Sequence, residues 1–512
     1  MFALVAGAVV ACINLSIANV ALPTIGTDLN ADQDQITAIA DAFALGLAST
    51  VLYLGAIGDR YGRKLMFVLG AFLTIPTSLL AAYAPTWEVL TVARLLGGFA
   101  AALLFPTTLS LISSLYSGKA RVRAIALWSG IGGGCAALGP VLGGWMLENF
   151  WWGSVFLITL PLVVVVLIVG WIVLPWHANE EDFKVDHRGG VLSVIGIGGL
   201  VLAIETADRG ISATWLVVAV ISLLALVAFF WWQLHAPRPL IDLQLAKHRT
   251  FWVAFVAGCI TFGSLIGAMF IGQQFTQNVL GYNTLDAALV VVPAAIFTAI
   301  MGQLSGGIIN RYGSRLSLML GLASVALAFT VMLVAWRDPT SLPWVVTAYA
   351  LIGAGVGLAA TPASRALMGS VPPARAGMGS GFLDLTRDFG GAVLQAIMGG
   401  VLAAAYARQM TSDLDSLPAA EASKVSSQVS QEITGSYTSA AEVAQNYPAP
   451  TSTDIVNAAA EAFTDGKTWA IAIALVMTVI GLGLVIALFP RKQKEEAYYA
   501  KVQGAQAAVT PG

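Results

Sequence analysis

Gly55-Ala-Ile-Gly-Asp-Arg-Tyr-Gly-Arg-Lys64 is the stretch that decides the fold. It lies between two apolar runs, so it indicates a short basic loop that joins two membrane helices. A second copy occurs at Gly306-Gly-Ile-Ile-Asn-Arg-Tyr-Gly-Ser-Arg315. Aligned without gaps, the Gly, Ile, Arg, Tyr and Gly positions match, and the last position is basic in both copies. The repeat predicts two homologous halves, a common plan for transporters with a site between the halves.

The composition of the chain is that of a membrane protein. Hydrophobic residues make up 57% of its 512 residues and charged residues 11%, against about 25% charged residues in an ordinary soluble domain. A soluble fold cannot hide so many apolar side chains, because its surface must also be covered. The formal net charge of −2 gives no sign of a nucleic-acid partner. Lipid is therefore the expected solvent for most of the chain.

The sequence shows no pattern typical of an enzyme. Its three cysteines, Cys12, Cys135 and Cys259, lie in apolar runs and have neither a disulfide-framework spacing nor a metal-ligand spacing. The sequence contains no phosphate-binding loop of the Walker type and no catalytic triad pattern. We therefore expect no metal, no cofactor and no enzyme activity.

Polar residues, prolines and glycines divide the chain into apolar runs of membrane length. A bilayer core needs roughly 20 apolar residues per helix, and fourteen runs meet this need, with twelve or thirteen as the alternative count. The expected fold class is an all-α polytopic membrane protein. Its expected spans are 2–22, 35–57, 65–84, 89–114, 124–147, 154–175, 189–207, 214–234, 251–276, 285–309, 316–336, 344–368, 378–406 and 468–489.

The repeat sets the expected domain boundaries. Six spans form each half, at 1–175 and at 251–489, and an inserted helix pair with its linkers occupies 176–250. Residues 490–512 form a tail. The loop 407–467 before the last span carries three basic and eight acidic residues and is rich in Ser, Ala and Thr. This composition favours a solvated tether with a short helix over a cap on the outer vestibule.

The basic residues indicate the orientation. Of the 26 Lys and Arg residues, nineteen fall on one side of the expected spans and five on the other. Cytoplasmic loops carry the excess of basic residues in membrane proteins. Both termini are therefore expected in the cytoplasm, with the chain in the cell membrane.

Together with three further motifs, the loop at 55–64 carries a resemblance to a known family. The loop is similar to the signature between helices 2 and 3 of the major facilitator superfamily. The wider pattern resembles the fourteen-span drug:proton antiporters of that superfamily. The other motifs that carry the resemblance are Asn14-Leu-Ser-Ile-Ala-Asn-Val-Ala-Leu-Pro23 of helix 1, Arg94-Leu-Leu-Gly-Gly-Phe-Ala-Ala101 of helix 4 and Gly139-Pro140-Val-Leu-Gly143-Gly144 of helix 5.

The resemblance implies a proton-coupled antiporter, a monomer that exports small lipophilic and often cationic compounds by alternating access. Two positions depart from the pattern. Asn14 stands where helix 1 usually carries an acidic residue, and Cys135 stands where helix 5 usually has a glycine. The first departure weakens the case for a proton or cation role of helix 1.

Five charged residues are expected well inside the membrane, and Glu205 lies nearer an end of an inserted helix. Insertion of a charge into a bilayer core costs at least about 2.5–3.5 kcal/mol, so such residues are functional candidates. The candidates for proton coupling or cation binding are Asp41, Arg94, Asp384, Arg387 and Asp388.

Each of these candidates also has a plain structural alternative. Asp41 could be exposed to water near its helix end, and Arg94 could be one member of an ion pair that only holds helices together. Asp384 and Asp388 share a helix face because they are four residues apart. A local pair of Asp384 with Arg387 would still leave one carboxylate uncompensated.

Two sets of residues are candidates for gating. The loop residues Asp59, Arg60, Gly62, Arg63 and Lys64 are expected to form a latch that breaks and reforms between access states. The second copy has Asn310 in place of Asp59, so its latch is expected to be weaker. In the fifth span, Gly139, Pro140, Gly143 and Gly144 are expected to form a bend that seals the two halves.

Aromatic and amide residues are the candidates for a substrate pocket. The set comprises Asn14, Phe43, Trp128, Gln273, Gln274 and Phe297. Two rival functions remain open at this point. One is the export of an endogenous metabolite, lipid or siderophore, and the other is a membrane sensor that transports nothing.

Overall fold

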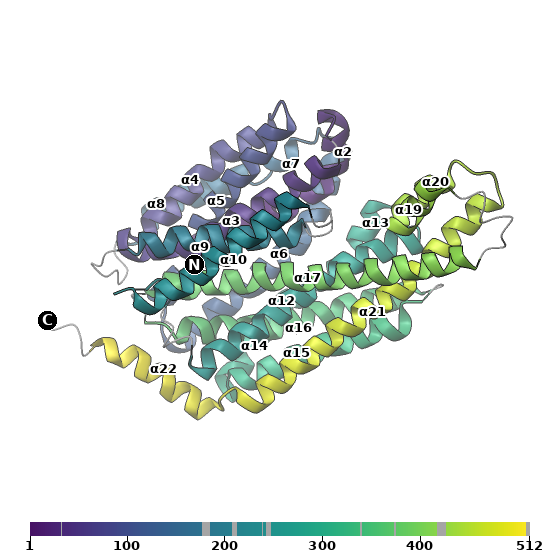
Figure 1. The fold of residues 1–512 in the computed structure, drawn as a ribbon. Helices are drawn as coiled ribbons and strands as arrows, with labels where there is room; N and C mark the ends of the chain where they lie inside the picture. Colours follow the sequence, from purple (N-terminus) through teal and green to yellow (C-terminus); the bar gives the residue numbers. More distant parts are fainter. Residues whose placement is uncertain are drawn as a thin grey trace.

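The computed structural model describes residues 1–31, 33–176, 185–206, 212–237, 239–241, 247–337, 340–372, 375–416 and 426–507. Every regular element in these ranges is a helix, as the sequence predicts (Figure 1). The helices of the first half, drawn in purple and blue, lie together, and those of the second half, drawn in teal to yellow, lie together beside them. The fold class is therefore all-α.

The first half begins with a bent helix pair. The bent pair is α1 (Phe2–Ser16) and α2 (Ala18–Leu29). The first half continues with α3 (Gln33–Tyr61), α4 (Arg63–Ala82), α5 (Trp87–Leu115), α6 (Gly118–Asn149), α7 (Ser154–Leu157) and α8 (Leu160–Val173).

The inserted pair is α9 (His187–Glu205) and α10 (Ala213–His235). It packs on the outside of the first half, where the Tyr53 hydroxyl of α3 lies 2.7 Å from Nδ1 of His187. The Ser222 hydroxyl of α10 donates to the Gly196 carbonyl of α9 at 2.7 Å. Leucines are exposed on another face of α10, where Leu223 and Leu224 are each 63% exposed. An apolar face of this kind suits contact with lipid.

The second half contains the longest helices. It consists of α12 (Arg249–Gln274), the π-helix η2 (Phe275–Val279), α13 (Thr284–Leu289), α14 (Val292–Tyr312), α15 (Ser314–Ala335), α16 (Leu342–Gly369), α17 (Ala376–Asp415), α19 (Ser427–Gly435), α20 (Tyr437–Ala444) and α21 (Thr451–Leu488). The tail helix α22 (Lys492–Ala507) follows.

Twelve of the described helices are long and apolar enough to cross a membrane. The pair α1 and α2, which bends by 41°, makes a thirteenth span if it is taken as one. The remaining expected span, 124–147, falls on α6, which is 32 residues long but includes residues whose side chains are not described. The exact count of fourteen therefore stays a prediction.

The two repeat loops have the same local conformation. Gly62 begins the turn into α4 with φ 112°, and Gly313 begins the turn into α15 with φ 92°. Positive φ strongly favours glycine, which has no Cβ. The two matching glycines of the repeat are thus required by the same turn. We call the end of the helix bundle that carries both turns the Gly62 end.

Backbones of the two halves approach each other closely through small residues. A Cβ atom at Gly55 of α3 would lie 2.7 Å from the Gly377 carbonyl of α17. A Cβ atom at Gly302 of α14 would lie 2.9 Å from the Cα atom of Gly130 on α6. Such contacts need residues without side chains. The pairs α3–α17 and α6–α14 therefore form the interface between the halves.

The segment 407–467 differs from the solvated tether that its composition favours. Helix α17 continues to Asp415 and α21 begins at Thr451, while α19 and α20 lie at the outer ends of these long helices (Figure 1). Ala440 and Phe463 are buried, and the Tyr406 hydroxyl donates to the Ile433 carbonyl at 3.1 Å. The described part of the segment is helical because it buries its own apolar face, which composition alone does not reveal.

Lys467 also differs from its expected place in the external loop. It is 1% exposed on α21, its ammonium group donates to the Trp336 carbonyl, and it lies 4.0 Å from the centre of the Phe275 ring. A cation over an aromatic face is stabilised by the ring quadrupole. The Trp336 carbonyl and the Phe275 ring thus accommodate a lysine that the sequence analysis placed in an external loop.

Candidate functional site

Arg94 lies at the centre of the first half and is 3% exposed. Its Nη1 atom donates to the Asn14 carbonyl at 2.8 Å, and its Nε atom donates to the Ile39 carbonyl at 3.5 Å. The guanidinium group lies 4.8 Å from the Phe43 ring centre and 5.9 Å from that of Phe156. Arg94 of α5 therefore connects α1, α3 and α7.

Close packing of α3 against α5 positions this arginine. Gly98 leaves no room for a Cβ atom against the Phe43 carbonyl, and Gly46 leaves none against the Leu95 carbonyl. The glycines that follow Arg94 in the helix-4 motif thus bring the Phe43 ring onto the guanidinium group. A larger residue at Gly98 would separate the helices and remove this contact.

Asn14 and Asp41 surround the same arginine. The Asn14 side-chain oxygen accepts a hydrogen bond from the Thr159 hydroxyl at 3.0 Å, and Asn14 is 7% exposed. The Asp41 carboxylate is the acidic group whose charge acts on Arg94. Asn14 is thus held in place by hydrogen bonds, and in this part of the site the acidic charge comes from α3 instead of helix 1.

A small cavity opens beside Arg94. Its volume is about 20 Å³, which is enough for about one water molecule. Its lining includes Asn14, Phe43, Thr77, Arg94 and Phe156. Two of the expected pocket residues, Asn14 and Phe43, therefore meet at this arginine, but this conformation leaves no room there for an organic molecule.

The acidic pair of the second half lies on α17 at the interface between the halves. Asp384 is 2% exposed, and the Oδ2 atoms of Asp384 and Asp388 have no hydrogen-bond partner among the described residues. The Nε atom of Arg387 lies 3.7 Å from Oδ1 of Asp388. The structural alternative in the sequence was a local pair of Arg387 with Asp384, whereas the ion pair found among the described residues joins Arg387 to Asp388.

Arg387 also reaches across to the first half. Its Nη1 atom donates to the thiol sulfur of Cys12 at 3.9 Å, and its guanidinium group lies 4.4 Å from the Phe105 ring centre. Phe105 in turn lies 5.1 Å from the ring of Trp128, whose indole N–H donates to the Thr108 hydroxyl at 2.7 Å. Arg387 thus places α17 against α1 and α5 in the middle of the molecule.

The other expected pocket residues lie elsewhere. Gln273 and Gln274 are half-buried at the end of α12, and Phe297 of α14 is 38% exposed. None of the three lines the cavity beside Arg94. The structure therefore groups Asn14 and Phe43 with Arg94, and Trp128 with Arg387, and it leaves these three residues apart.

Asp59 joins the two halves at the Gly62 end. Its Oδ1 atom accepts from the backbone N–H of Gly377 at 2.8 Å, and its Oδ2 atom accepts from that of Met378 at 3.3 Å. These N–H groups belong to the first turn of α17, where a carboxylate satisfies unpaired donors and complements the helix dipole. The loop of the first half thus caps a helix of the second half.

Arg63 completes this cap. Its Nε and Nη2 atoms donate to Oδ1 of Asp59 at 3.1 and 2.9 Å, and its Nη1 atom donates to the Ser114 hydroxyl. Asp59 and Arg63 are 2% and 1% exposed. Both charges are therefore compensated although they are buried.

The remaining loop cations contact aromatic rings. Lys64 lies 4.1 Å from the Trp176 ring centre, and the Arg60 guanidinium lies 5.5 Å from that of Tyr61. In these contacts Lys64 and Arg60 stay within the first half, whereas Asp59 connects the halves.

The glycines of the fifth-span motif pack inside the first half. Gly139 leaves no room for a Cβ atom against the Ser16 hydroxyl, and a Cβ atom at Gly143 would lie 3.0 Å from the Ile17 carbonyl. Both contacts are with the junction between α1 and α2. Gly144 is half-buried, and the side chain of Pro140 lies outside the described residues.

The second copy of the loop is completed by the tail helix. The Lys492 ammonium group donates to the Asn310 carbonyl at 2.8 Å. Glu495 is 0% exposed and accepts from the backbone N–H of Ser314 at 3.0 Å and from the Ser314 hydroxyl. The first turn of α15 is thus capped by an acid from α22.

Two neighbours support Glu495 in this position. The Tyr499 hydroxyl donates to it at 3.1 Å, and the Arg365 guanidinium lies 3.8 Å from the same carboxylate. Burial, together with the Glu495 charge, raises the pKa of the Tyr499 phenol. The phenol therefore stays protonated and can donate to the carboxylate.

Comparison with known proteins identifies the family. Residues 4–394 match the profile of the Major Facilitator Superfamily. The chain belongs to this superfamily. It is therefore a multi-pass membrane transporter, and the two halves with their matching loops are the two halves of a major facilitator protein.

Several similar curated proteins are named for drug efflux or drug resistance. This chain is 30% identical over 473 residues to the multidrug efflux pump LfrA of Mycolicibacterium smegmatis. The match covers 92% of this chain and 92% of the relative. It is 29% identical over 487 residues to the methyl viologen resistance protein SmvA of Salmonella typhimurium, covering 94% of this chain and 96% of the relative. It is 30% identical over 332 residues to the probable multidrug resistance protein EmrY of Escherichia coli, 64% of each chain.

Some residues around the site of this major facilitator protein were not candidates from the sequence. Phe105 and Thr159 lie in apolar runs, where nothing distinguishes them from packing residues, and Cys12 was noted only as a cysteine in such a run. The sequence gives a weak indication of the contact between Glu495 and Tyr499. The two residues are four apart in a tail with helical composition, so they share a helix face. Ser314, the partner of Glu495, became visible only in the folded chain.

Proposed function

We propose that this major facilitator protein is a proton-coupled antiporter that exports small lipophilic and often cationic compounds. The relatives support the drug-export part of the proposal, because LfrA and SmvA are similar over nearly the whole chain and are named for multidrug efflux and for resistance to methyl viologen. Methyl viologen is an organic cation, so acidic residues between the halves suit a substrate of this charge.

The observation that carries the proton coupling is the burial of Asp384. Its carboxylate is 2% exposed, and its Oδ2 atom has no hydrogen-bond partner among the described residues. A carboxylate in such surroundings is stabilised either by a proton or by a cation. One group that takes a proton or a cationic substrate, but not both, couples the movement of the two.

Arg387 and Asp388 would transmit this change between the halves. Arg387 is paired with Asp388 on α17 and also contacts Cys12 and Phe105 of the first half. A change of charge on Asp384, one helical turn before Asp388, alters the field on the guanidinium group and thus the contact between the halves. Arg94 with Asp41 would couple the first half in the same way.

The Gly62 end would be the cytoplasmic end. The twin loops there are rich in Arg and Lys, which favours the cytoplasmic side. This orientation places both termini in the cytoplasm and the transporter in the cytoplasmic membrane. We further propose that it functions as a monomer, with the proton gradient and no cofactor as its energy source.

The proposal is tested in inside-out membrane vesicles with an acidic interior and a ΔpH-sensitive dye. Methyl viologen is added to vesicles that contain the wild type, Asp384→Asn, Asp388→Asn, Asp41→Asn or Asp454→Asn. Asp454 is exposed in the first turn of α21 and serves as the matched control. We expect the cation to discharge the gradient with the wild type and Asp454→Asn, but not with Asp384→Asn.

Two outcomes contradict the proposal. If Asp384→Asn and Asp388→Asn both discharge the gradient at the wild-type rate, the pair does not carry protons. If no lipophilic cation discharges it in wild-type vesicles that contain folded protein, drug antiport is wrong, and export of an endogenous compound replaces it.

A further inference from the structure

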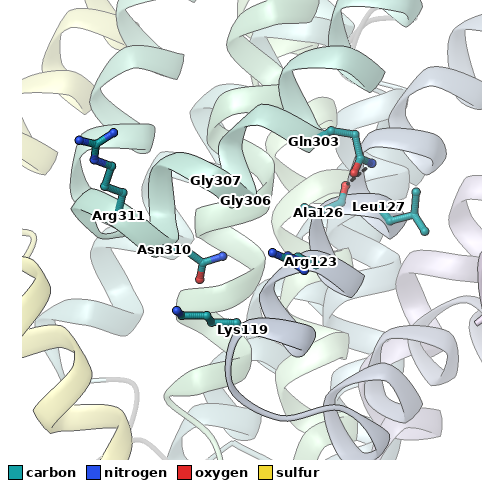
Figure 2. Close-up of a pocket in the computed structure, with 9 residues that line it drawn as sticks. All are labelled: Lys119, Arg123, Ala126, Leu127, Gln303, Gly306, Gly307, Asn310 and Arg311. Carbon is teal, nitrogen blue, oxygen red and sulfur yellow. Dashed lines mark hydrogen bonds between the residues drawn. The ribbon is translucent and has the colours of Figure 1, made fainter.

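A cavity lies between the halves at the Gly62 end. It has a volume of about 680 Å³ and opens between α6 of the first half and α14 of the second half. Figure 2 shows that Lys119 and Arg123 of α6 point toward Asn310 of α14, whereas Arg311 points away. The cavity is therefore built from both halves and is separate from the residues around Arg94 and Asp384.

The lining is basic. Lys119 and Arg123 supply two positive charges, Arg311 adds a third that points away, and none of the described lining residues is acidic. The polar remainder consists of Asn310 and Gln303, and the Gln303 amide donates to the Ala126 carbonyl at 3.5 Å. Helix α6 begins at Gly118, so the positive end of its dipole adds to the same field. This combination of charges attracts an anion.

The repeat explains why this cavity lacks an acid. In the first copy, Asp59 supplies a carboxylate that caps α17 of the other half. Asn310 occupies the matching position of the second copy and faces α6 of the other half across the cavity. An amide supplies no charge, so among the described lining residues no carboxylate faces Lys119 and Arg123 of α6.

We propose that this cavity binds a phosphate-bearing anion, held by Lys119 and Arg123 on one side and by the Asn310 amide on the other. A guanidinium group donates two parallel hydrogen bonds to phosphate oxygens, and an ammonium group adds a compact charge. The bound anion would bridge α6 and α14, as Asp59 bridges α3 and α17. It would thereby hold the halves together at the Gly62 end.

Two kinds of ligand carry such a phosphate group, an anionic phospholipid and free phosphate. The volume lies in the range of small-molecule pockets and exceeds what one phosphate ion fills, so the headgroup of an anionic phospholipid fits. Basic pockets between membrane helices on the cytoplasmic side suit such headgroups. Free phosphate offers the same oxygens without the glycerol and acyl groups.

The test measures binding to the purified full-length chain. Native mass spectrometry counts bound short-chain phosphatidylglycerol, with short-chain phosphatidylcholine as the headgroup of zero net charge. Equilibrium dialysis with radiolabelled inorganic phosphate measures the free ion. The variants are Lys119→Gln, Arg123→Gln and Asn310→Asp, and Lys494→Gln is the control, because Lys494 is an exposed cation of α22 at the same end.

We expect Lys119→Gln and Arg123→Gln each to weaken binding about tenfold, the effect of losing one charged contact. Asn310→Asp should weaken it at least as much, because it places a carboxylate opposite the anion. Lys494→Gln should bind as the wild type does. Lys119 and Arg123 are exposed, so these variants should fold normally, which size-exclusion chromatography checks.

The outcomes separate the sources and can overturn the proposal. Binding of phosphatidylglycerol but not of phosphate assigns the site to lipid, and binding of phosphate alone assigns it to the free ion. If the cavity variants bind both anions as tightly as the wild type, the proposal is wrong. If Lys494→Gln weakens binding as much as Arg123→Gln, the attraction is diffuse and no site exists.

Discussion

The carboxylate of Asp59 accepts the backbone N–H of Gly377 at 2.8 Å, and these two residues belong to different halves of the transporter. The contact has two parts, an N-terminal cap on α17 and an ion pair with Arg63. In the alternating-access cycle proposed above, the halves separate at this end, so the cap would break in every cycle. Its strength would then set how much time the chain spends closed there.

Two substitutions of Asp59 distinguish its role as a helix cap from its role as the counter-charge of Arg63. Asparagine keeps one acceptor oxygen for the Gly377 N–H but removes the negative charge that compensates the buried Arg63, whereas alanine removes both the acceptor and the charge. Loss of one partner from a buried pair costs about 3–5 kcal/mol, and loss of a cap about 1 kcal/mol more. We expect the midpoint of thermal unfolding to fall in the order wild type, Asp59→Asn, Asp59→Ala. Equal midpoints for all three would contradict the role of the cap.

The glycine pair beneath this cap should tolerate no side chain. A Cβ atom at Gly55 would lie 2.7 Å from the Gly377 carbonyl, and one at Gly377 would lie 2.8 Å from the Asp59 carboxylate carbon. Overpacking of this kind costs about 1–3 kcal/mol. We expect Gly55→Ala and Gly377→Ala to lower the unfolding midpoint and to slow export.

Gly483→Ala is the matched control for these two variants, because a Cβ atom there meets nothing within 4 Å. It should unfold at or slightly above the wild-type temperature, since alanine favours helix. Destabilisation of Gly483→Ala equal to that of Gly55→Ala would show that the close approach of α3 and α17 has no special role.

Arg94 should not be replaceable by lysine. Its guanidinium group reaches the Asn14 and Ile39 carbonyls while it lies over the Phe43 ring, and a single ammonium group cannot make these contacts together. A lost hydrogen bond to a charged group costs about 1.5–3 kcal/mol. We therefore expect Arg94→Lys to reduce the rate of proton-coupled export on the order of tenfold in the vesicle assay.

Arg408→Lys provides the comparison for Arg94→Lys, because Arg408 is exposed on α17. This control should export at the wild-type rate. Export by Arg94→Lys at that same rate would show that a positive charge alone is sufficient at this position, and the geometric argument would fail.

Charged candidates could be named from the sequence because charges stand out in apolar runs. Arg94 and Asp384 could be named from cost alone, since a bilayer core excludes charges that have no role, whereas the loop at Asp59 was named from its repeat and its family signature. The turn glycines Gly62 and Gly313 were visible through the repeat. Direct contacts between the halves could not be predicted from the sequence, because contacting residues such as Asp59 and Gly377 are 318 residues apart.

Aromatic residues were harder to place. Phe43 and Phe297 look alike in sequence, yet Phe43 lies over Arg94 and Phe297 is 38% exposed. Helical periodicity says which face a residue occupies, but in a membrane both lipid and the protein core are apolar. The signal that separates inside from outside in soluble helices is therefore weak here.

The tail helix supplies the last prediction. Glu495 is fully buried and caps α15 through Ser314, while its neighbour Glu496 is 52% exposed and lies 3.8 Å from Lys492. Removal of the Glu495 carboxylate leaves the Ser314 N–H and the Tyr499 hydroxyl without their acceptor, at a cost of about 1–3 kcal/mol. Glu495→Ala should therefore lower the midpoint of thermal unfolding, whereas Glu496→Ala removes only an exposed pair worth about 0–1 kcal/mol. Equal midpoints for the two variants would mean that α22 does not hold the second loop.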